Sequence, residues 1–326
     1  MRFTERDPGA GRVAPPEDDE ATRTIARLGM DDVLEAARAG GLDAALARLV
    51  RSLAGVKASV GPRTWSRVLA AARAHPLRGF LHLDPFTLRC YARPGGQAGD
   101  AAALDYALRP RELSMPLSDP VAALHQCMIR GQTARALRYR RDCLARAIEE
   151  AAEKCDRPPR ILAAGCGHLR ECDGVLAFGT RRIGRIIALD ADPDALERVR
   201  RDYASLPVVA HVGSVRDLVR GADGFADMDL VYCSGLMESL PQEAAAALAR
   251  SLFSALRPGG TLVVTQFLAG LAEAAFLEVY MDWHMTYRTK AEAMALVEPL
   301  LPEAPLGCSY QESPEATLCA ISLQRR

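Results

Sequence analysis

The sequence lacks the features that mark several classes of protein. No apolar run approaches the roughly 18 residues that a membrane helix needs, and the first residues, M-R-F-T-E-R-D-P-G-A-G-R, contain no apolar signal core. The 41 Lys and Arg residues balance the 41 Asp and Glu residues, so no net charge attracts a polyanion such as DNA or RNA. These absences favour a cytoplasmic protein that binds neither membranes nor nucleic acids.

Disulfide and metal patterns are also missing. The nine cysteines are scattered and form no C-x-x-C pair, so reduced, buried thiols in a cytoplasm are the simplest interpretation. Cys166, His168 and Cys172 match no common zinc spacing, and we predict no metal site. The chain contains no phosphate loop of the form G-x-x-x-x-G-K-[ST].

Composition and helical spacing divide the chain into four parts. The Ala-, Leu- and Arg-rich helical pattern breaks at Gly40-Gly41 and resumes at Gly61-Pro62. A second helical stretch is capped by Ser118 and Asp119 and is interrupted near Gly131. We predict a disordered tail (1–20), an N-terminal helical cap region (21–118, less regular after residue 75), connecting helices (119–157) and an α/β domain (158–326).

Strands and helices alternate beyond residue 158, which implies a mainly parallel sheet with helices on both faces. Only a short Glu-Ser-Pro turn separates the last two strands, so they should form an antiparallel pair at the sheet edge. The expected strands are 161–164, 185–190, 208–213, 229–233, 261–267, 308–311 and 316–323. The predicted fold class is therefore α/β, with five parallel strands and a C-terminal antiparallel hairpin.

The most informative segment is R-I-L-A-A-G-C-G-H-L-R-E, residues 160–171. An apolar strand leads into Gly165-Cys166-Gly167 and then into a predicted helix start. Such a turn lets the backbone approach a ligand and directs amide N–H groups toward it. A dinucleotide site would have a third glycine where this chain has Arg170. A tight turn without a ligand is the other alternative.

An acidic residue closes the second predicted strand. Asp190 at that position can bind both hydroxyls of a ribose, with Ala191 beside it, while Asp192 is better placed to cap the next helix. Further on, L-R-P-G-G-T-L-V-V-T (256–265) suggests a helix end, a Pro-Gly-Gly turn and a buried strand. Together these segments resemble the class I methyltransferases that depend on S-adenosylmethionine (SAM). The resemblance implies a Rossmann-like sheet, SAM as cofactor and S-adenosylhomocysteine as product.

The resemblance assigns further cofactor contacts. In these enzymes a polar side chain and a backbone amide after the third strand hold the adenine, which points here to Ser214 and Val215, with a simple turn as the alternative. Cys233 and Ser234 follow the fourth strand and are expected beside the methyl donor, because ligands bind at the carboxyl ends of such strands. Glu238, in the loop after this strand, is either an acceptor-side carboxylate or a solvated loop acid.

Two positions depart from the commonest methyltransferase motif. Ala163 stands where an acidic residue usually helps to hold the ammonium of the methionine moiety, and Leu169 stands where a third glycine is frequent. Glu171, or an acid from the N-terminal region, is expected to hold the ammonium instead. Arg140, on the helix before the first strand, is expected to reach the SAM carboxylate, with a solvated helix face as the alternative.

Three segments resemble a narrower family, the bacterial proteins named for biosynthesis of the extracellular-factor 3-hydroxypalmitic acid methyl ester. They are G-C-G-H-L-R-E, the segment 84–106 that begins D-P-F-T-L-R, and Y-M-D-W-H-M-T-Y-R-T at 280–289. Gln97 stands where that family usually has a tyrosine, which indicates an altered pocket wall and a different substrate.

Four residues are predicted on the acceptor side. Asp100 is expected to accept a hydrogen bond from the acceptor or to cap a helix. His168 is expected to orient the acceptor, to act as a base or to lie over a helix N-terminus. Tyr287 and Arg288 are placed on a helix after the fifth strand, where an arginine can grip a carboxylate, although packing explains most of the aromatic spacing there.

The sequence thus predicts a SAM-dependent methyltransferase that acts on a small molecule at an oxygen, either a carboxylate or a hydroxyl. Methylation at nitrogen is an alternative, and so is a SAM-binding sensor or scaffold without catalysis. The absence of an N-P-P-Y-type segment argues against methylation of a nucleobase amino group.

Overall fold

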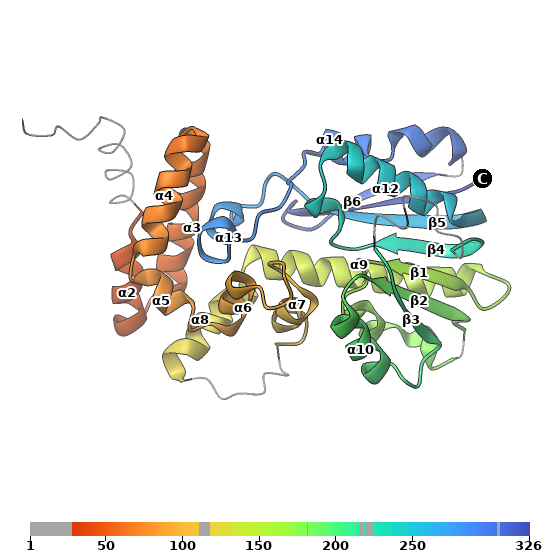
Figure 1. Cartoon of the computed structure of the whole chain (residues 1–326), viewed down its shortest axis with the longest axis horizontal. Coiled ribbons are helices and arrows are strands. Elements are labelled where there is room, and N and C mark those ends of the chain that lie inside the picture. The colour runs from red at the N-terminus through yellow and green to blue at the C-terminus, as the bar shows by residue number, and fades with distance from the viewer. Residues whose placement is uncertain (1–27, 111–117, 181, 215–217, 219–224, 305–306) are drawn as a thin grey trace, which may run out of the picture.

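The computed structural model describes residues 28–110, 118–180, 182–214, 218, 225–304 and 307–326. A group of N-terminal helices lies beside a sheet that carries helices on both faces (Figure 1). The helices before the sheet are α2 (Met30–Ala39), α3 (Leu42–Ser59), α4 (Pro62–Ala74), α5 (Leu77–Leu81), α6 (Pro85–Ala92), α7 (Ala101–Leu108), α8 (Asp119–Arg130) and α9 (Gln132–Lys154). The predicted tail, 1–20, lies outside the described residues.

The predicted helix breaks are confirmed. Gly40 and Gly41, with φ values of 94° and 90°, separate α2 from α3, and a left-handed backbone of this kind favours glycine. Gly61 precedes Pro62, the first residue of α4. Ser118 occupies the N-cap of α8, but its side chain makes no capping hydrogen bond, contrary to our expectation.

The segment after residue 75 is more regular than its prolines suggest, because two aspartates begin helices in it. Asp84 caps α6 by accepting from Thr87 N at 2.7 Å, and Asp100 caps α7 by accepting from Ala103 N at 2.7 Å. These contacts supply partners for amide groups that have none within the helix.

The sheet confirms the predicted fold class. Its strands follow the order β3-β2-β1-β4-β5-β7-β6; β1 to β5 are parallel, and β7 pairs antiparallel with both β5 and β6. The strands are β1 (Arg160–Ala164), β2 (Arg185–Asp190), β3 (Val208–Val212), β4 (Met228–Cys233), β5 (Leu256–Phe267), β6 (Cys308–Glu312) and β7 (Leu318–Gln324). The helices among them are η2 (Arg170–Gly174), η3 (Leu176–Phe178), α10 (Pro193–Asp202), η4 (Met237–Ser239), α12 (Gln242–Ser254), α13 (Ala274–Tyr280), α14 (Lys290–Ala295) and η5 (Glu298–Glu303).

One strand begins earlier than predicted. β5 starts at Leu256 and includes the Pro-Gly-Gly segment that we expected to be a turn. Leu256 pairs with Met228, and Thr261 pairs with Leu230, so the extra residues form a bulge. A Cβ on Gly260 would lie 2.7 Å from the carbonyl oxygen of Met228, which explains the glycine at this position.

Two elements connect the N-terminal helices to the sheet. Along α9, Leu137 packs in the core of the helical region, and Leu144 packs on one sheet face. Phe276 and Tyr280 of α13 belong to the helical core although they follow β5 in sequence. α12 and α14 cover the opposite sheet face. The cores are therefore continuous through shared elements, and α7 is held near the carboxyl ends of the central strands.

Candidate functional site

The glycine segment forms a tight loop after β1. Gly165 and Gly167 have φ values of 66° and 50°, and the amides of Gly165 and Cys166 donate to Leu189 O at 2.8 and 3.1 Å. A Cβ on Gly165 would lie 2.6 Å from Leu236 Cγ, so a larger residue does not fit. The α-helix start expected here is wrong: after Leu169, at φ 55°, the chain enters the short 3-10 helix η2.

Asp190 connects β2 to this loop. Its Oδ2 accepts from Gly167 N at 2.8 Å, and its Oδ1 accepts from Asp192 N at 3.0 Å. A carboxylate has about four acceptor positions, so it retains capacity for a ligand. Asp192 itself caps α10 by accepting from Asp194 N at 2.9 Å, as its sequence position predicts.

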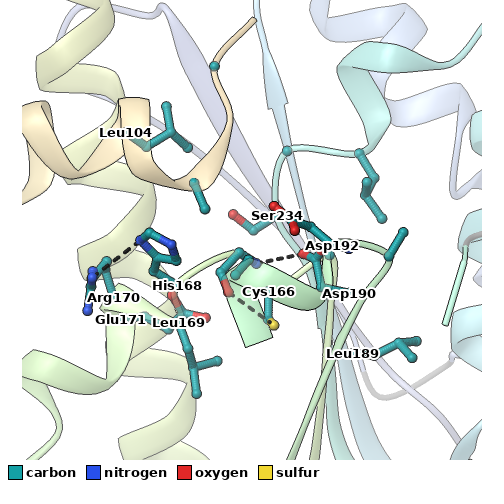
Figure 2. A pocket seen from close by; sticks show the side chains of 18 of the residues that line it. Leu104, Cys166, His168, Leu169, Arg170, Glu171, Leu189, Asp190, Asp192 and Ser234 are labelled. Carbon is teal, nitrogen blue, oxygen red and sulfur yellow. Dashed lines mark hydrogen bonds between the residues drawn. The ribbon is translucent and has the colours of Figure 1, made fainter. Parts of the chain in front are cut away.

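A cavity of about 220 Å³, here called the glycine-loop cavity, opens against this loop (Figure 2). Its walls come from the glycine loop, the ends of β2, β3 and β4, and helices α7 and α9. The predicted site residues among its lining are Arg140, Gly165, Cys166, Gly167, His168, Glu171, Asp190, Ala191, Ser214 and Ser234. The structure therefore brings together in one place residues from five separate segments.

Two predicted cofactor residues are not among this lining. Val215 lies outside the described residues, so its expected contact stays a prediction. Cys233 is fully buried and packs in the core between the sheet and α12. Successive side chains of a strand point to opposite faces, and Ser234, one residue later, lines the cavity. The Cys233 side chain therefore does not face the cavity, and its expected position beside the methyl donor stays a prediction.

Two buried charged groups of opposite sign line the glycine-loop cavity. Arg140, 7% exposed, makes no hydrogen bond or ion pair with any residue that the structure describes, and burial lowers the pKa of its guanidinium. Glu171, 6% exposed, accepts from Tyr232 Oη at 2.6 Å. Burial raises the pKa of Glu171, and the hydrogen bond from Tyr232 and the charge of Arg140 oppose this shift.

A second cavity of about 290 Å³, here called the tryptophan cavity, adjoins the first. The two share the wall residues Gln97, Gly99, Leu104, Arg140 and Gly235. Gly99, at φ 69°, lies so close to Trp283 that a Cβ would be 2.4 Å from its ring carbon Cζ2. A ligand in one cavity would therefore lie next to a ligand in the other.

Glu238 of η4 lines the tryptophan cavity and is only 3% exposed. Its Oε1 accepts from Phe267 N at 3.3 Å, whereas its Oε2 is buried and has no partner among the described residues. Burial raises the pKa of this carboxyl, and Arg140 opposes the shift. The sequence left open whether Glu238 is an acceptor-side carboxylate or a solvated loop acid, and its burial contradicts the solvated alternative.

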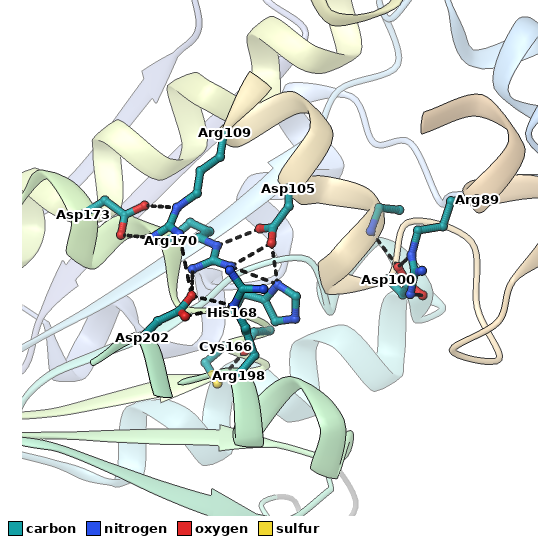
Figure 3. Close-up of polar contacts among 12 residues, drawn as sticks. Arg89, Asp100, Asp105, Arg109, Cys166, His168, Arg170, Asp173, Arg198 and Asp202 are labelled. Carbon is teal, nitrogen blue, oxygen red and sulfur yellow. Dashed lines mark hydrogen bonds and ion pairs between the residues drawn. The ribbon is translucent and has the colours of Figure 1, made fainter. Parts of the chain in front are cut away.

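A polar cluster holds α7 against the glycine loop (Figure 3). Asp105 of α7 lies 2.8 Å from His168 Nδ1 and accepts from Arg170 at 2.7 Å through each oxygen. Arg170 also donates to Asp202 of α10 at 2.6 Å. Burial opposes ionisation of Asp105, but the hydrogen bonds from Arg170 and His168 outweigh it and lower its pKa to about 2. His168 thus joins the cap to the cavity wall, and no α-helix N-terminus lies beneath it.

Asp100 does not face either cavity. Besides capping α7, its oxygens each accept from Arg89 at 2.9 Å, and the residue is 4% exposed. The helix-cap alternative is confirmed. The geometry contradicts the predicted contact between Asp100 and the acceptor, because the Asp100 carboxylate is already paired with Arg89 (Figure 3).

The predicted helix bearing Tyr287 and Arg288 is also wrong. α13 ends at Tyr280, and the chain then runs extended because Arg288 pairs with the end of β5, its amide donating to Phe267 O at 3.2 Å. The Arg288 guanidinium is 1% exposed and donates to Gln242 Oε1, Met237 O, Gln266 Oε1 and Leu240 O at 2.5–2.8 Å. It therefore has no face open to an acceptor. Tyr287 packs against the helical core and lines neither cavity.

Several wall residues were missed by sequence analysis. Leu104, Leu137, Leu218 and Leu236 line the glycine-loop cavity, yet in sequence they look like ordinary core leucines. Trp283 was interpreted as packing, and only the closeness of Gly99 reveals its place in a cavity wall. No group of three or more His, Cys, Asp or Glu residues in the described chain could hold a metal. Within the same residues, no helix is long and apolar enough to cross a membrane.

Comparison with known proteins identifies a shared domain. A family model described as a methyltransferase domain matches residues 136–298, half of the chain. A possible exported protein from Bordetella parapertussis has the same fold, with 16% identity, a TM-score of 0.56, and 96% of this chain and 99% of that chain covered. No curated protein matches the chain.

Two methyltransferases of known structure also match, with lower TM-scores. One is a TehB-like SAM-dependent methyltransferase from Corynebacterium glutamicum (17% identity, TM-score 0.37, 59% of this chain and 96% of that chain covered). The other is magnesium protoporphyrin IX methyltransferase from Synechocystis PCC 6803 (10% identity, TM-score 0.45, 68% of this chain and 94% of that chain covered).

Proposed function

The chain belongs to the family defined by this methyltransferase domain, and from that membership we propose that it transfers a methyl group from SAM to an oxygen of a small molecule. The observation that supports the proposal best is the pair of adjoining cavities, which share five wall residues. One would hold the methyl donor and the other the acceptor. S-adenosylhomocysteine would be the product.

The residues of the glycine-loop cavity suit the polar groups of SAM. Gly165 and Gly167 line the cavity, and Asp190 retains acceptor positions for ribose hydroxyls. Arg140, buried without a partner among the described residues, suits the carboxylate of the methionine moiety, and Glu171 suits its ammonium. Ser214 lies where the adenine would be held.

The role of this chain in the transfer would be mainly to hold SAM and the acceptor and to orient one against the other. Bound SAM supplies a methyl group that is electrophilic because it is attached to a sulfonium. The shared walls of the two cavities would keep an acceptor beside that methyl group, and such positioning accounts for much of the acceleration of a displacement reaction. Trp283 and Gly99 pack closely against each other in the wall of the tryptophan cavity.

The tryptophan cavity also supports a small-molecule acceptor. Gln97 and Gly99 come from one segment that resembles the methyl ester biosynthesis family, and Trp283, His284 and Met285 come from another. These two segments are far apart in sequence yet meet in the wall of the same cavity, where Gly99 contacts Trp283. Its volume of about 290 Å³ suits a small metabolite.

The proposed setting is the cytoplasm, without a membrane or nucleic-acid partner. All nine cysteines are free thiols, which suits a reducing compartment. The balance of 41 basic and 41 acidic residues gives no general attraction for nucleic acid.

Labelled SAM provides the test. The protein would be incubated with methyl-tritiated SAM and a cell extract that has been separated into a low-molecular-mass fraction and a macromolecular fraction. We expect protein-dependent label in the low-mass fraction only. Label in proteins or RNA alone would contradict a small-molecule acceptor, and no binding of S-adenosylhomocysteine to the folded protein would contradict the proposed function as a whole.

A further inference from the structure

We infer that Glu238 contacts the methyl acceptor and takes up its proton, so that the acceptor is a neutral hydroxyl compound and not a carboxylate anion. This inference rests on the proposed function and narrows its substrate class. Methylation at oxygen includes both hydroxyl and carboxylate acceptors, and the surroundings of Glu238 favour the hydroxyl.

The first argument is the unmatched hydrogen-bonding capacity of Glu238. Its side chain is almost fully buried, yet one oxygen has no partner among the described residues, and the other has a single long contact of 3.3 Å with Phe267 N. A buried acceptor without a donor costs roughly 1–3 kcal/mol, and more when it is charged. Because Glu238 lines the tryptophan cavity, the missing donor is expected to come from a ligand there. A hydroxyl supplies one; a carboxylate anion does not.

The second argument is the charge balance of the tryptophan cavity. Arg93 and Asp282, which both line it, form an ion pair with each other, and His284 also contacts Asp282 at 3.0 Å. The remaining charged residues of the lining are Arg140 and Glu238. Arg140 already faces Glu171 as well. An anionic acceptor would add a second negative charge beside Glu238 at a buried place, which is unfavourable.

The third argument is chemical. Burial raises the pKa of Glu238, which makes its carboxylate a stronger base than one in water and better matched to a hydroxyl proton. The acceptor oxygen forms a bond to the methyl carbon while the bond from that carbon to sulfur breaks, and sulfur retains the electron pair. The hydroxyl proton moves to Oε2 of Glu238. A carboxylate acceptor has no proton to give and needs no such base.

The walls of the cavity indicate what carries the hydroxyl. Phe267, Trp283 and Met285 present apolar surface around Glu238, so an apolar or aromatic body is expected. 2-Naphthol and 2-naphthoate form a suitable probe pair, since they share a ring system and differ in the group that would face Glu238.

Binding is measured first, because it does not require turnover. Calorimetry on the protein saturated with S-adenosylhomocysteine should show tighter binding of 2-naphthol than of 2-naphthoate. In Glu238→Gln this preference should fall at least about tenfold, the size of one hydrogen bond to a charged group. The exposed Glu243 of α12 provides the control: Glu243→Gln should retain the parental preference.

Turnover is measured next, with methyl-tritiated SAM and 2-naphthol. Glu238→Gln should lower the rate of label transfer about 10²-fold or more, as expected for a lost general base, and should keep parental affinity for S-adenosylhomocysteine. Glu243→Gln should transfer label at the parental rate.

Three results would overturn this inference and leave the proposed function intact: tighter binding of 2-naphthoate, binding of neither probe, or equal behaviour of Glu238→Gln and the parental protein. Loss of S-adenosylhomocysteine binding by the parental protein would instead overturn the proposed function itself.

Discussion

At the scale of single residues, three acidic side chains near the two cavities differ in how far the protein satisfies them. Asp100 is paired with Arg89 and with a helix amide, so it is structural. Asp190 accepts two backbone amides and keeps free positions toward its cavity. Glu238 has one long contact and one oxygen without a partner in the described chain. The less a buried carboxylate is satisfied internally, the more a ligand contact is needed to explain it.

The role of Asp190 is tested by its removal. Asp190→Ala should weaken binding of SAM and S-adenosylhomocysteine by about 1–3 kcal/mol, because the ribose hydroxyls lose a partly buried acceptor. Calorimetry on the folded variant measures this directly. The matched control is Asp194→Ala, an exposed aspartate in the first turn of α10, which should leave the affinity unchanged. Unchanged affinity of Asp190→Ala would show that the cofactor lies elsewhere.

Arg288 is expected to act on stability. Arg288→Lys keeps the charge but cannot reach four acceptors from one planar fork, so the free energy of unfolding should fall by about 2–4 kcal/mol. Urea unfolding monitored by circular dichroism measures the change. Tyr287→Phe should be close to neutral, because the Tyr287 hydroxyl has no partner among the described residues. A stable Arg288→Lys variant with a raised KM for the acceptor would contradict the structural role.

At the scale of elements, α7 is a wall that ion pairs hold in place. Its residues Leu104 and Leu108 line the glycine-loop cavity, and Asp105 on the same helix joins His168 and Arg170 of the glycine loop. The position of the cap is thereby coupled to the loop that contacts the cofactor. Displacement of α7 should disturb both cavities, because they share Leu104.

Removal of the Asp105 carboxylate should lower the free energy of unfolding by an amount that depends on pH. The pKa of Asp105 is lowered to about 2 in the folded protein, against about 3.9 in an unfolded chain. The ionised form therefore stabilises the fold fully above about pH 4, and this contribution is lost as the pH falls toward 2. The stability difference between the parental protein and Asp105→Asn, from urea unfolding, should be constant from pH 7 to pH 5 and shrink below pH 4. A difference that grows on acidification would contradict the assigned pairing.

The sequence predicted those elements whose signals are local. The seven strands follow from apolar runs and turns, and Asp190 follows from its place at a strand end. The end of α13 could not be predicted, because the aromatic spacing continues through Trp283 while a distant pairing with β5 extends the chain at Arg288. The role of Glu238 stayed open for a similar reason: its burial depends on contacts with β5 and α9, far away in sequence.

At the scale of the whole molecule, the helical region and the sheet do not separate cleanly. α13 follows β5 but packs among α3 and α4, and Glu278 on it contacts Lys57 and accepts from Trp65 Nε1 at 3.0 Å. The cap is therefore part of the hydrophobic core that supports the tryptophan cavity, and its helices do more than cover a finished domain.

A truncated chain that begins at Asp119 tests this continuity. It would expose Phe276, Leu277 and Tyr280, which are at most 3% exposed in the full chain, at a cost of roughly 1.5–3 kcal/mol for each side chain. We expect it to lose cooperative thermal unfolding and binding of S-adenosylhomocysteine. A truncated chain that unfolds cooperatively and transfers label at the parental rate would show that the helical region is dispensable.

The central claim is that the glycine-loop cavity holds SAM and presents its methyl group to the tryptophan cavity. A crystal structure of the protein soaked with SAM tests it most directly. We predict the ribose on Asp190, the methionine carboxylate beside Arg140, and the methyl carbon facing the wall that Gly99 and Gly235 share between the two cavities. SAM bound with its methyl group directed away from the tryptophan cavity, or bound outside the glycine-loop cavity, would contradict the account.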